Sequence, residues 1–230
     1  MKIVIINPNS TQSMTDKIGE AARAVASPGT TILATNPANT PPSVEGHRDE
    51  AVSLPPTLDL IKAHKDADAF VIACFDDFGI GACREVTDKP GLGICEAAMV
   101  AASIVAMRFS VVTTLARAVP IIEDLCEHYG MERRCRRVRA ADFPVLKLEN
   151  DAQAAADALR AEIFRAVRED AVDAIILGCA GMADLSETLS RELGLPVIDG
   201  VAAGTKFAEA MVGLGVRTSK AGGYGWPPEK

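Results

Sequence analysis

The sequence has no long apolar run, and its basic residues are outnumbered by acidic ones. Its 230 residues include 24 Lys and Arg against 31 Asp and Glu, a net charge of −7. Nucleic-acid binding needs a basic surface that displaces counterions from phosphates, so this balance argues against such a partner. The apolar stretch at residues 3–6 is too short for a signal peptide, and no stretch elsewhere is long enough to span a bilayer. We expect a cytoplasmic protein without membrane contact, whose partner is a small molecule.

Motifs for metal and cofactor sites are missing as well. The six cysteines are dispersed and form no Cys-x-x-Cys pair, which argues against a disulfide framework. The three histidines lie far apart and show no metal-ligand spacing, so no metal is expected. No Gly-x-Gly-x-x-Gly or Gly-Lys-Ser/Thr loop opens a helix, which leaves a nucleotide cofactor unsupported. We therefore expect no cofactor, and reduced thiols remain as candidate reactive groups.

Short apolar runs rich in β-branched residues alternate with segments of helical periodicity. This alternation predicts α/β units on a mainly parallel sheet. The strands expected in the first half are 3–6, 31–35, 70–73 and 93–95, and its helices are expected to begin after Ser10 or Thr11, near Pro56 and at Glu96.

The second half repeats the order of the first. Residues 68–74 (DAFVIAC) match residues 173–179 (DAIILGC), 105 positions later, and the runs at 109–113 and around Val138 match the first two strands. Two copies of one α/β unit are the simplest architecture. We expect a first half at 1–106, a second half at 107–200, and a final helix and tail at 201–230 that pack back on the first half.

Cys74 and Cys179 close matching strands of this repeat. Parallel sheets bind ligands at the carboxyl ends of their strands, so two halves facing each other would bring both thiols to one cleft. A helix opening directly after each cysteine would lower the thiol pKa, and its N–H groups could hold an enolate oxygen. A single strand-end cysteine is more often a small buried hydrophobic residue. Two at matching positions favour proton transfer from both faces of one carbon.

Seven short motifs, taken in order and spacing, resemble the hydantoin racemase branch of the aspartate/glutamate racemase superfamily from end to end. They are residues 5–10 (IINPNS), 43–46 (SVEG), 71–77 (VIACFDD), 93–97 (GICEA), 111–114 (VVTT), 177–182 (LGCAGM) and 197–200 (VIDG). The resemblance implies two flavodoxin-like (Rossmann-like) halves related by pseudo-two-fold symmetry, an active site between them, no cofactor, and Cys74 and Cys179 as acid and base. Phe78 stands where many relatives carry proline, which bears on the pocket rim. The residues expected to bind substrate are Asn9, Val44, Phe75, Asp76, Thr113, Thr114, Ala180, Gly181 and Met182.

Two acidic residues follow the first cysteine directly. An acidic pair such as Asp76 and Asp77 most often caps a helix. Negative charge beside the cleft would also disfavour a dicarboxylate substrate and raise the pKa of Cys74. A neutral ring that presents N–H donors fits better than free glutamate or aspartate. The expected reaction is racemisation at C5 of a 5-monosubstituted hydantoin.

Several alternatives stay open. Within the superfamily they are an allantoin racemase, an amino-acid racemase and a cysteine-dependent cis–trans isomerase of a small diacid, whereas a one-cysteine decarboxylase is disfavoured by the second thiol. A small-molecule binding protein is the alternative from another class. The basic run at 133–137 is interpreted as a solvated surface or subunit contact of a homo-oligomer. The other cysteines are expected to be structural: Cys83 and Cys126 in helices, Cys95 in a strand and Cys135 in a turn.

Overall fold

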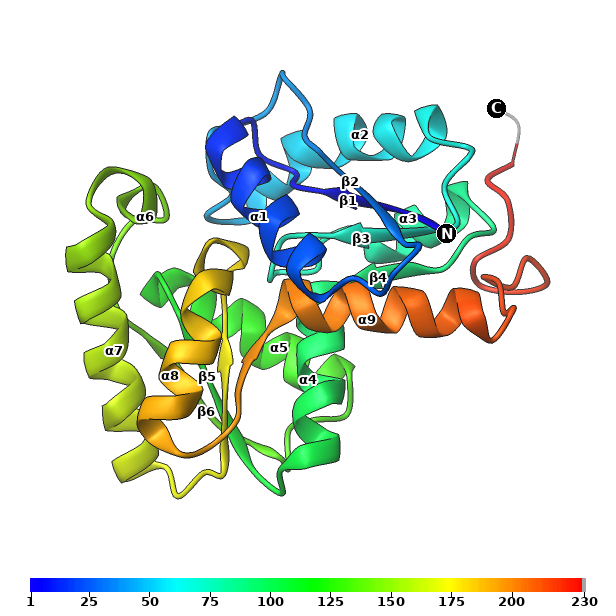
Figure 1. Cartoon of the computed structure of the whole chain (residues 1–230). Helices are drawn as coiled ribbons and strands as arrows, with labels where there is room; N and C mark the ends of the chain where they lie inside the picture. Colours follow the sequence, from blue (N-terminus) through cyan, green and yellow to red (C-terminus); the bar gives the residue numbers. More distant parts are fainter. Residues whose placement is uncertain (229–230) are drawn as a thin grey trace.

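Two four-stranded parallel sheets form the centre of the molecule (Figure 1). The computed structural model describes residues 1–228, except the side chains of residues 148, 149, 183 and 184. The strand orders, β2-β1-β3-β4 and β6-β5-β7-β8, are the same in both halves, which confirms the predicted α/β fold of two similar units. The strands are β1 (Lys2–Ile6), β2 (Thr31–Thr35), β3 (Ala69–Ile72), β4 (Gly91–Gly93), β5 (Phe109–Thr113), β6 (Cys135–Ala140), β7 (Ala174–Leu177) and β8 (Val197–Asp199).

Helices cover both faces of each sheet. They are α1 (Gln12–Val25), α2 (His47–Ala63), α3 (Ile80–Val86), α4 (Ile94–Val105), α5 (Val119–His128), α6 (Lys147–Asn150), α7 (Ala152–Glu169), α8 (Ser186–Leu193) and α9 (Gly200–Gly213), with short 3-10 turns η1 (Ala116–Ala118) and η2 (Ala180–Leu185). No helix within the described part of the chain is long and apolar enough to cross a membrane.

Alternate residues of the central strands point to different cores. Ile3 and Ile5 of β1 lie in one buried cluster with Val111 of β5 and Ile176 of β7, whereas Val4 packs in a separate cluster on the opposite face of the first sheet. The side chains of a strand alternate between its two faces, so the uninterrupted apolar runs of the sequence serve two cores at once. The inner cluster joins the two halves into one body.

The two halves exchange helices across this shared core. α4 follows β4 of the first sheet but packs against β7 and β8 of the second, while α9 follows β8 and packs against β3 and β4 of the first (Figure 1). The two helices approach closely near their beginnings. A Cβ atom on Gly200 would lie 2.7 Å from the carbonyl oxygen of Ile94, and one on Gly204 would lie 3.0 Å from Cγ1 of Val71. Gly200 is therefore needed where the two helices cross, and Gly204 lets α9 lie close to β3.

The expected start of α2 near Pro56 is wrong. The helix begins at His47, and Pro55 and Pro56 lie in its interior. Proline lacks an N–H group and normally interrupts a helix interior, so in the sequence the pair favours a helix start. Asp49 and Glu50 occupy the true first turn, where negative charge favours a helix N-terminus.

Three local expectations around the cysteines are also wrong. Cys95 lies in the first turn of α4, because β4 ends at Gly93. Cys135 begins β6 instead of lying in a turn, since β6 pairs with β5 from this residue onward. No helix opens directly after Cys74: a turn intervenes and α3 begins only at Ile80.

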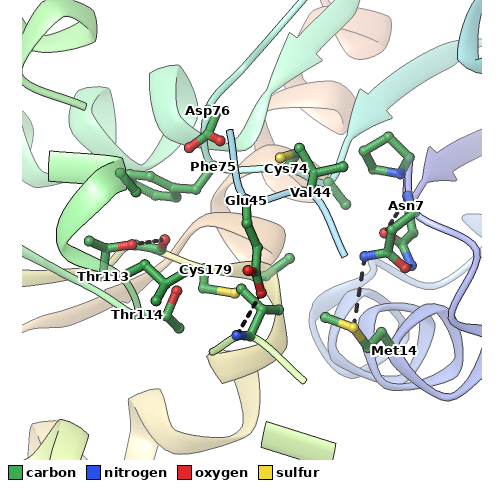
Figure 2. A pocket seen from close by; sticks show the side chains of 18 of the residues that line it. Asn7, Met14, Val44, Glu45, Cys74, Phe75, Asp76, Thr113, Thr114 and Cys179 are labelled. Atoms are coloured by element: carbon green, nitrogen blue, oxygen red, sulfur yellow. Dashed lines mark hydrogen bonds between the residues drawn. The ribbon is translucent and has the colours of Figure 1, made fainter. Parts of the chain in front are cut away.

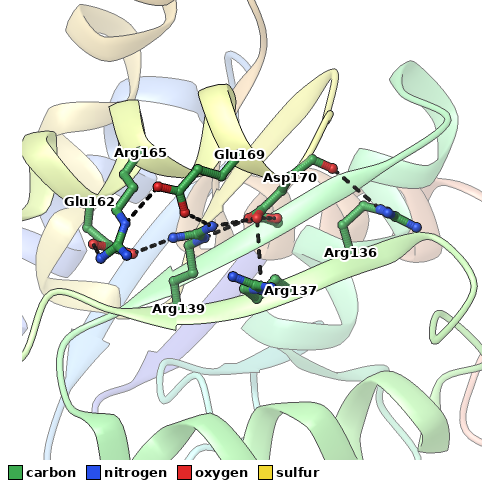
Figure 3. Close-up of polar contacts among 8 residues, drawn as sticks. Arg136, Arg137, Arg139, Glu162, Arg165, Glu169 and Asp170 are labelled. Carbon is green, nitrogen blue, oxygen red and sulfur yellow. Dashed lines mark hydrogen bonds and ion pairs between the residues drawn. The ribbon is translucent and has the colours of Figure 1, made fainter.

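A buried ion cluster holds the edge strand β6 (Figure 3). The Arg139 guanidinium donates hydrogen bonds to Asp170 at 2.7 Å, Glu162 at 2.9 Å and Glu169 at 2.9 Å. Asp170 also accepts a hydrogen bond of 2.8 Å from the Ser110 hydroxyl of β5. These hydrogen bonds compensate the buried charge of Arg139. Since Asp170 follows α7, they also fix β5 and β6 to the end of that helix.

Candidate active site

A pocket lies between the two halves at the carboxyl ends of their central strands (Figure 2). Its empty volume, including the open mouth, is about 580 Å³. The residues that line it are Asn7, Pro8, Asn9, Met14, Ile18, Val44, Glu45, Ala73, Cys74, Phe75, Asp76, Thr113, Thr114, Leu115, Ala118, Val145, Gly178, Cys179 and Ala180.

Cys74 and Cys179 face this pocket from opposite halves (Figure 2). They follow β3 and β7, which occupy the same position in the two sheets. In both turns the cysteine carbonyl accepts a hydrogen bond of 3.2 Å from the N–H three residues later. In both, the backbone N–H two residues later acts to lower the pKa of the thiol. The repeat therefore extends to the backbone hydrogen bond of each cysteine turn.

Burial governs the ionisation of both thiols. Desolvation raises the pKa of Cys179 to about 11, and it raises the pKa of Cys74 well above its ordinary value, helped by the negative charge of Asp76. The backbone N–H groups act in the opposite direction but are outweighed. The expectation that helix N-termini lower both pKa values is therefore wrong. The physical reason at Cys74 is that α3 begins six residues downstream, beyond the reach of its dipole.

Asp76 lies beside Cys74 at the pocket wall (Figure 2). Burial, together with the charge of Glu50 on α2, raises the pKa of Asp76 to about 7. Among the described residues its carboxyl group has no hydrogen-bond partner. A carboxyl group in this state is available to a ligand, either as an acceptor or, when protonated, as a donor.

The side-chain amide of Asn9 has a hydrogen-bonded oxygen and a nitrogen without a strong acceptor. Its Oδ1 accepts hydrogen bonds of 2.9 Å from Asn7 Nδ2 and from the Thr11 N–H. Its Nδ2 reaches only the sulfur of Met14, at 3.8 Å, which is a weak acceptor. The fixed amide therefore keeps a donor for a ligand. Asn7, which holds Asn9 in place, was not among the residues expected from the sequence.

Thr113, the last residue of β5, and Thr114, which follows it, differ in role. The Thr113 hydroxyl donates to the Gly178 carbonyl at 3.0 Å, and a Cβ atom on Gly178 would lie 2.9 Å from the Thr113 Cβ. Thr113 therefore packs against the strand end that carries Cys179. The Thr114 hydroxyl, in contrast, has no partner among the described residues and faces the pocket.

Two backbone N–H groups at the pocket also lack acceptors. Phe75 and Ala180, which follow the two cysteines, are 4% and 7% exposed, and no described residue accepts a hydrogen bond from either N–H. Buried N–H groups are nearly always paired in folded proteins. Their position next to the thiols makes them candidate donors to a bound ligand.

A contact between the halves narrows the mouth of the pocket. Glu45, from the loop before α2, accepts hydrogen bonds from the Val145 N–H at 3.0 Å and from the Ser43 hydroxyl at 3.2 Å. Val44 lies beside it at the pocket wall. The sequence drew attention to this loop, but it gave no signal for a contact between residues 100 positions apart.

Three residues considered from the sequence do not line the pocket. Gly181 follows the pocket-lining residues Cys179 and Ala180, Met182 is fully buried in the core cluster that contains Val112 and Leu177, and Phe78 lies beyond the pocket-lining part of its turn. Besides Asn7 and Glu45, the lining residues absent from the expected set include Met14, Ile18, Leu115, Ala118 and Val145. No group of three or more His, Cys, Asp or Glu residues in the described structure gathers in a way that could hold a metal ion.

Comparison with known proteins gives the family. The model of the Asp/Glu/hydantoin racemase family matches residues 3–208. The chain belongs to this family. The racemase is 52% identical over 229 residues to a hydantoin racemase of Rhizobium meliloti, covering 99% of this chain and 95% of the relative. It is 49% identical to a hydantoin racemase of Pseudomonas sp. (strain NS671), covering 100% of this chain and 93% of that relative.

A solved structure resembles the racemase over its whole length. Allantoin racemase from Klebsiella pneumoniae is 47% identical, with a TM-score of 0.98, covering 100% of this racemase and 95% of that chain. These relatives, together with the family match, identify the protein as a racemase and hence an isomerase.

Proposed function

We propose that the racemase inverts C5 of 5-monosubstituted hydantoins without a cofactor, by two-base proton transfer between Cys74 and Cys179. One observation carries this proposal: two thiols at equivalent strand ends face a single pocket from opposite halves, in turns with the same backbone hydrogen bond. A planar intermediate held between them would expose one face to each sulfur.

The proton steps follow from this arrangement. The thiolate of one cysteine removes the C5 proton, forming an S–H bond while the C–H electron pair moves to the adjacent carbonyl oxygen. The N–H groups of Phe75 and Ala180 are suitably placed to stabilise the developing enolate charge. The opposite thiol then donates its proton to the other face of C5. The two thiols have exchanged roles at the end of a turnover.

The charge of the pocket supports a neutral ring as substrate. No Lys, Arg or His side chain occurs among the described residues that line it, whereas Asp76 and Glu45 are acidic. A free amino acid or a small diacid would bring a carboxylate without a cationic partner. A hydantoin ring instead presents N–H donors to carboxylates and carbonyl oxygens to Asn9 and the free N–H groups.

A specific observation favours allantoin as a second candidate. Allantoin is a hydantoin that carries a ureido group at C5, so the same chemistry applies, and the solved structure at 47% identity is an allantoin racemase. Glu45 at the pocket mouth could accept hydrogen bonds from a ureido group. The apolar wall formed by Val44, Leu115, Ala118 and Val145 suits an aliphatic substituent instead.

Circular dichroism would test the reaction. Single enantiomers of 5-methyl-, 5-isobutyl- and 5-(2-methylthioethyl)-hydantoin, allantoin and free glutamate would be incubated with the enzyme, a chelator and a reductant, without added cofactor. We expect the hydantoins to lose their signal and glutamate to keep it. Racemisation of glutamate alone, or a dependence on an added cofactor, would contradict the proposal.

Exposed apolar side chains support a homo-oligomer. Ile104, Val105 and Met107, at the end of α4, are 73%, 60% and 74% exposed. Such patches commonly form subunit contacts. Light scattering after size exclusion should give a multiple of the 24.2 kDa chain, and a monomer would contradict this expectation.

A further inference from the structure

The turn after Cys74 contains a backbone conformation that a non-glycine residue rarely adopts. Asp77 has a φ of 44°, in the left-handed region, and its side chain is buried. Its N–H donates to the Cys74 carbonyl at 3.2 Å, so the position of this residue and that of the cysteine are coupled. Such a conformation persists only where surrounding contacts enforce it.

Three hydrogen bonds to the Asp77 carboxylate provide this enforcement. It accepts from the Cys95 N–H at 3.1 Å, the Glu96 N–H at 2.8 Å and the Tyr129 hydroxyl at 2.9 Å. The first two are the unpaired N–H groups at the start of α4, so Asp77 caps a helix that lies 17 residues further along the chain. A Cβ atom on Gly93, the residue before this helix, would lie 2.2 Å from the Asp77 carboxyl carbon. Glycine at this position makes room for the carboxylate.

All three donors belong to elements that pack on the second sheet. α4 packs against β7 and β8, and Tyr129 directly follows α5, which packs against β6. Asp77 therefore ties the turn of Cys74, in the first half, to the half that carries Cys179.

Among the described residues, the turn of Cys179 makes no such hydrogen bond from the position equivalent to Asp77. The residue that matches Asp77 is Met182, which is apolar and buried in the outer core. Its helix α9 is capped locally by Asp199, which accepts hydrogen bonds from the Val201 N–H at 3.2 Å and the Ala202 N–H at 2.7 Å. The same capping task is thus performed locally in one half and by the cysteine turn in the other.

We propose that Asp77 and Tyr129 are positioning residues that hold the Cys74 thiol at the correct place opposite Cys179. The inference rests on the proposed two-cysteine reaction. Because these hydrogen bonds hold the turn of Cys74 itself, their loss should impair proton transfer by Cys74 and spare proton transfer by Cys179.

Exchange of the C5 proton in D₂O, measured separately for each enantiomer of 5-isobutylhydantoin, tests this asymmetry. The Cys74→Ser and Cys179→Ser variants first assign each enantiomer to the thiol that deprotonates it. Tyr129→Phe should then slow exchange of the Cys74-dependent enantiomer about 10-fold, since small misplacements of reacting groups have large effects on rate. The exchange rate of the other enantiomer should change less than about 2-fold, and the variant should keep the wild-type KM.

Two further variants support the interpretation. Gly93→Ala displaces the Asp77 carboxylate from the other side and should give the same one-sided loss. Tyr224→Phe removes the hydroxyl of the partly exposed tyrosine in the C-terminal tail and should change neither exchange rate. If the cysteine variants behave as proposed but Tyr129→Phe slows both enantiomers equally, or neither, the positioning role is refuted and the two-base reaction stands. If both cysteine variants racemise at the wild-type rate, the proposed reaction fails and the positioning role fails with it.

Discussion

Asp76→Asn offers a sharp test of the electrostatics of the pocket. The wild-type carboxyl group lies at the pocket wall with a pKa raised from 3.8 to about 7 by burial and by the charge of Glu50. The asparagine amide has nearly the same shape and carries no charge. The substitution therefore removes a desolvated charge while leaving the packing almost unchanged.

The sign and size of the effect follow from proton linkage. Because the folded pKa lies above the unfolded value, the native state keeps a proton that the unfolded state has lost between about pH 4 and pH 7. The free energy of unfolding of the wild type therefore falls as the pH rises through this window. A shift of about three pKa units corresponds to ~4 kcal/mol as an upper limit. Water in the pocket screens the charge, so we expect Asp76→Asn to be more stable at pH 8 by about 1–2 kcal/mol.

Urea unfolding at pH 5 and pH 8, followed by circular dichroism under reducing conditions, measures this difference. The gain in stability should be larger at pH 8. An equal gain at both pH values, or a loss at pH 8, would refute the reasoning. Asp77→Asn is the comparison in the same turn: burial also raises the pKa of Asp77 to about 7, but its carboxyl group accepts three hydrogen bonds, whose disruption should cost about 1–3 kcal/mol and offset the gain from removing the charge.

Other expected outcomes concern catalysis, the pocket mouth and stability. For the enantiomer deprotonated by Cys179, kcat/KM should rise about tenfold per pH unit from pH 7 towards pH 10, since burial holds the pKa of this thiol near 11; a plateau below pH 8 would contradict this. Glu45→Ala removes the acceptor of the Val145 N–H and should raise KM roughly 5-fold without lowering Tm. Glu45→Gln keeps an acceptor and should leave KM unchanged in steady-state kinetics. Arg139→Met leaves buried carboxylates uncompensated and should cost about 3–5 kcal/mol in urea unfolding; a loss below about 1 kcal/mol would argue against this role. Activity should survive chelators and be lost on thiol alkylation, and zinc-reversible inactivation by a chelator would refute the proposed chemistry.

The central strands and the internal repeat could be predicted because they depend on local pattern. Apolar β-branched runs such as 3–6 and 174–177 are buried on both faces of parallel sheets, so no other element competes for them. The matching runs that end at Cys74 and Cys179 also indicated that both thiols would lie at equivalent strand ends, where the structure places them.

The start of α1 after Thr11 agrees with the sequence, but the start of α4 and the ionisation of the thiols could not be predicted, because they depend on distant contacts. The beginning of α4 is capped by Asp77 from another loop, and no local signal reveals this. The expected lowering of the thiol pKa values assumed a helix after Cys74 and ignored burial, which proved the larger effect. The hydrogen bond of Glu45 could not be predicted for a similar reason, since its partner Val145 lies in the other half.

The exchange of α4 and α9 between the sheets has a consequence for the origin of the molecule. A half-length chain ending after its fourth helix would leave that helix without its own sheet to cover, and two such chains would satisfy each other by trading helices. The single chain thus has the architecture of a domain-swapped dimer whose two copies have been fused end to end. On this view each ancestral subunit carried one cysteine, and a cleft with a thiol on either side existed before the two halves shared a single chain.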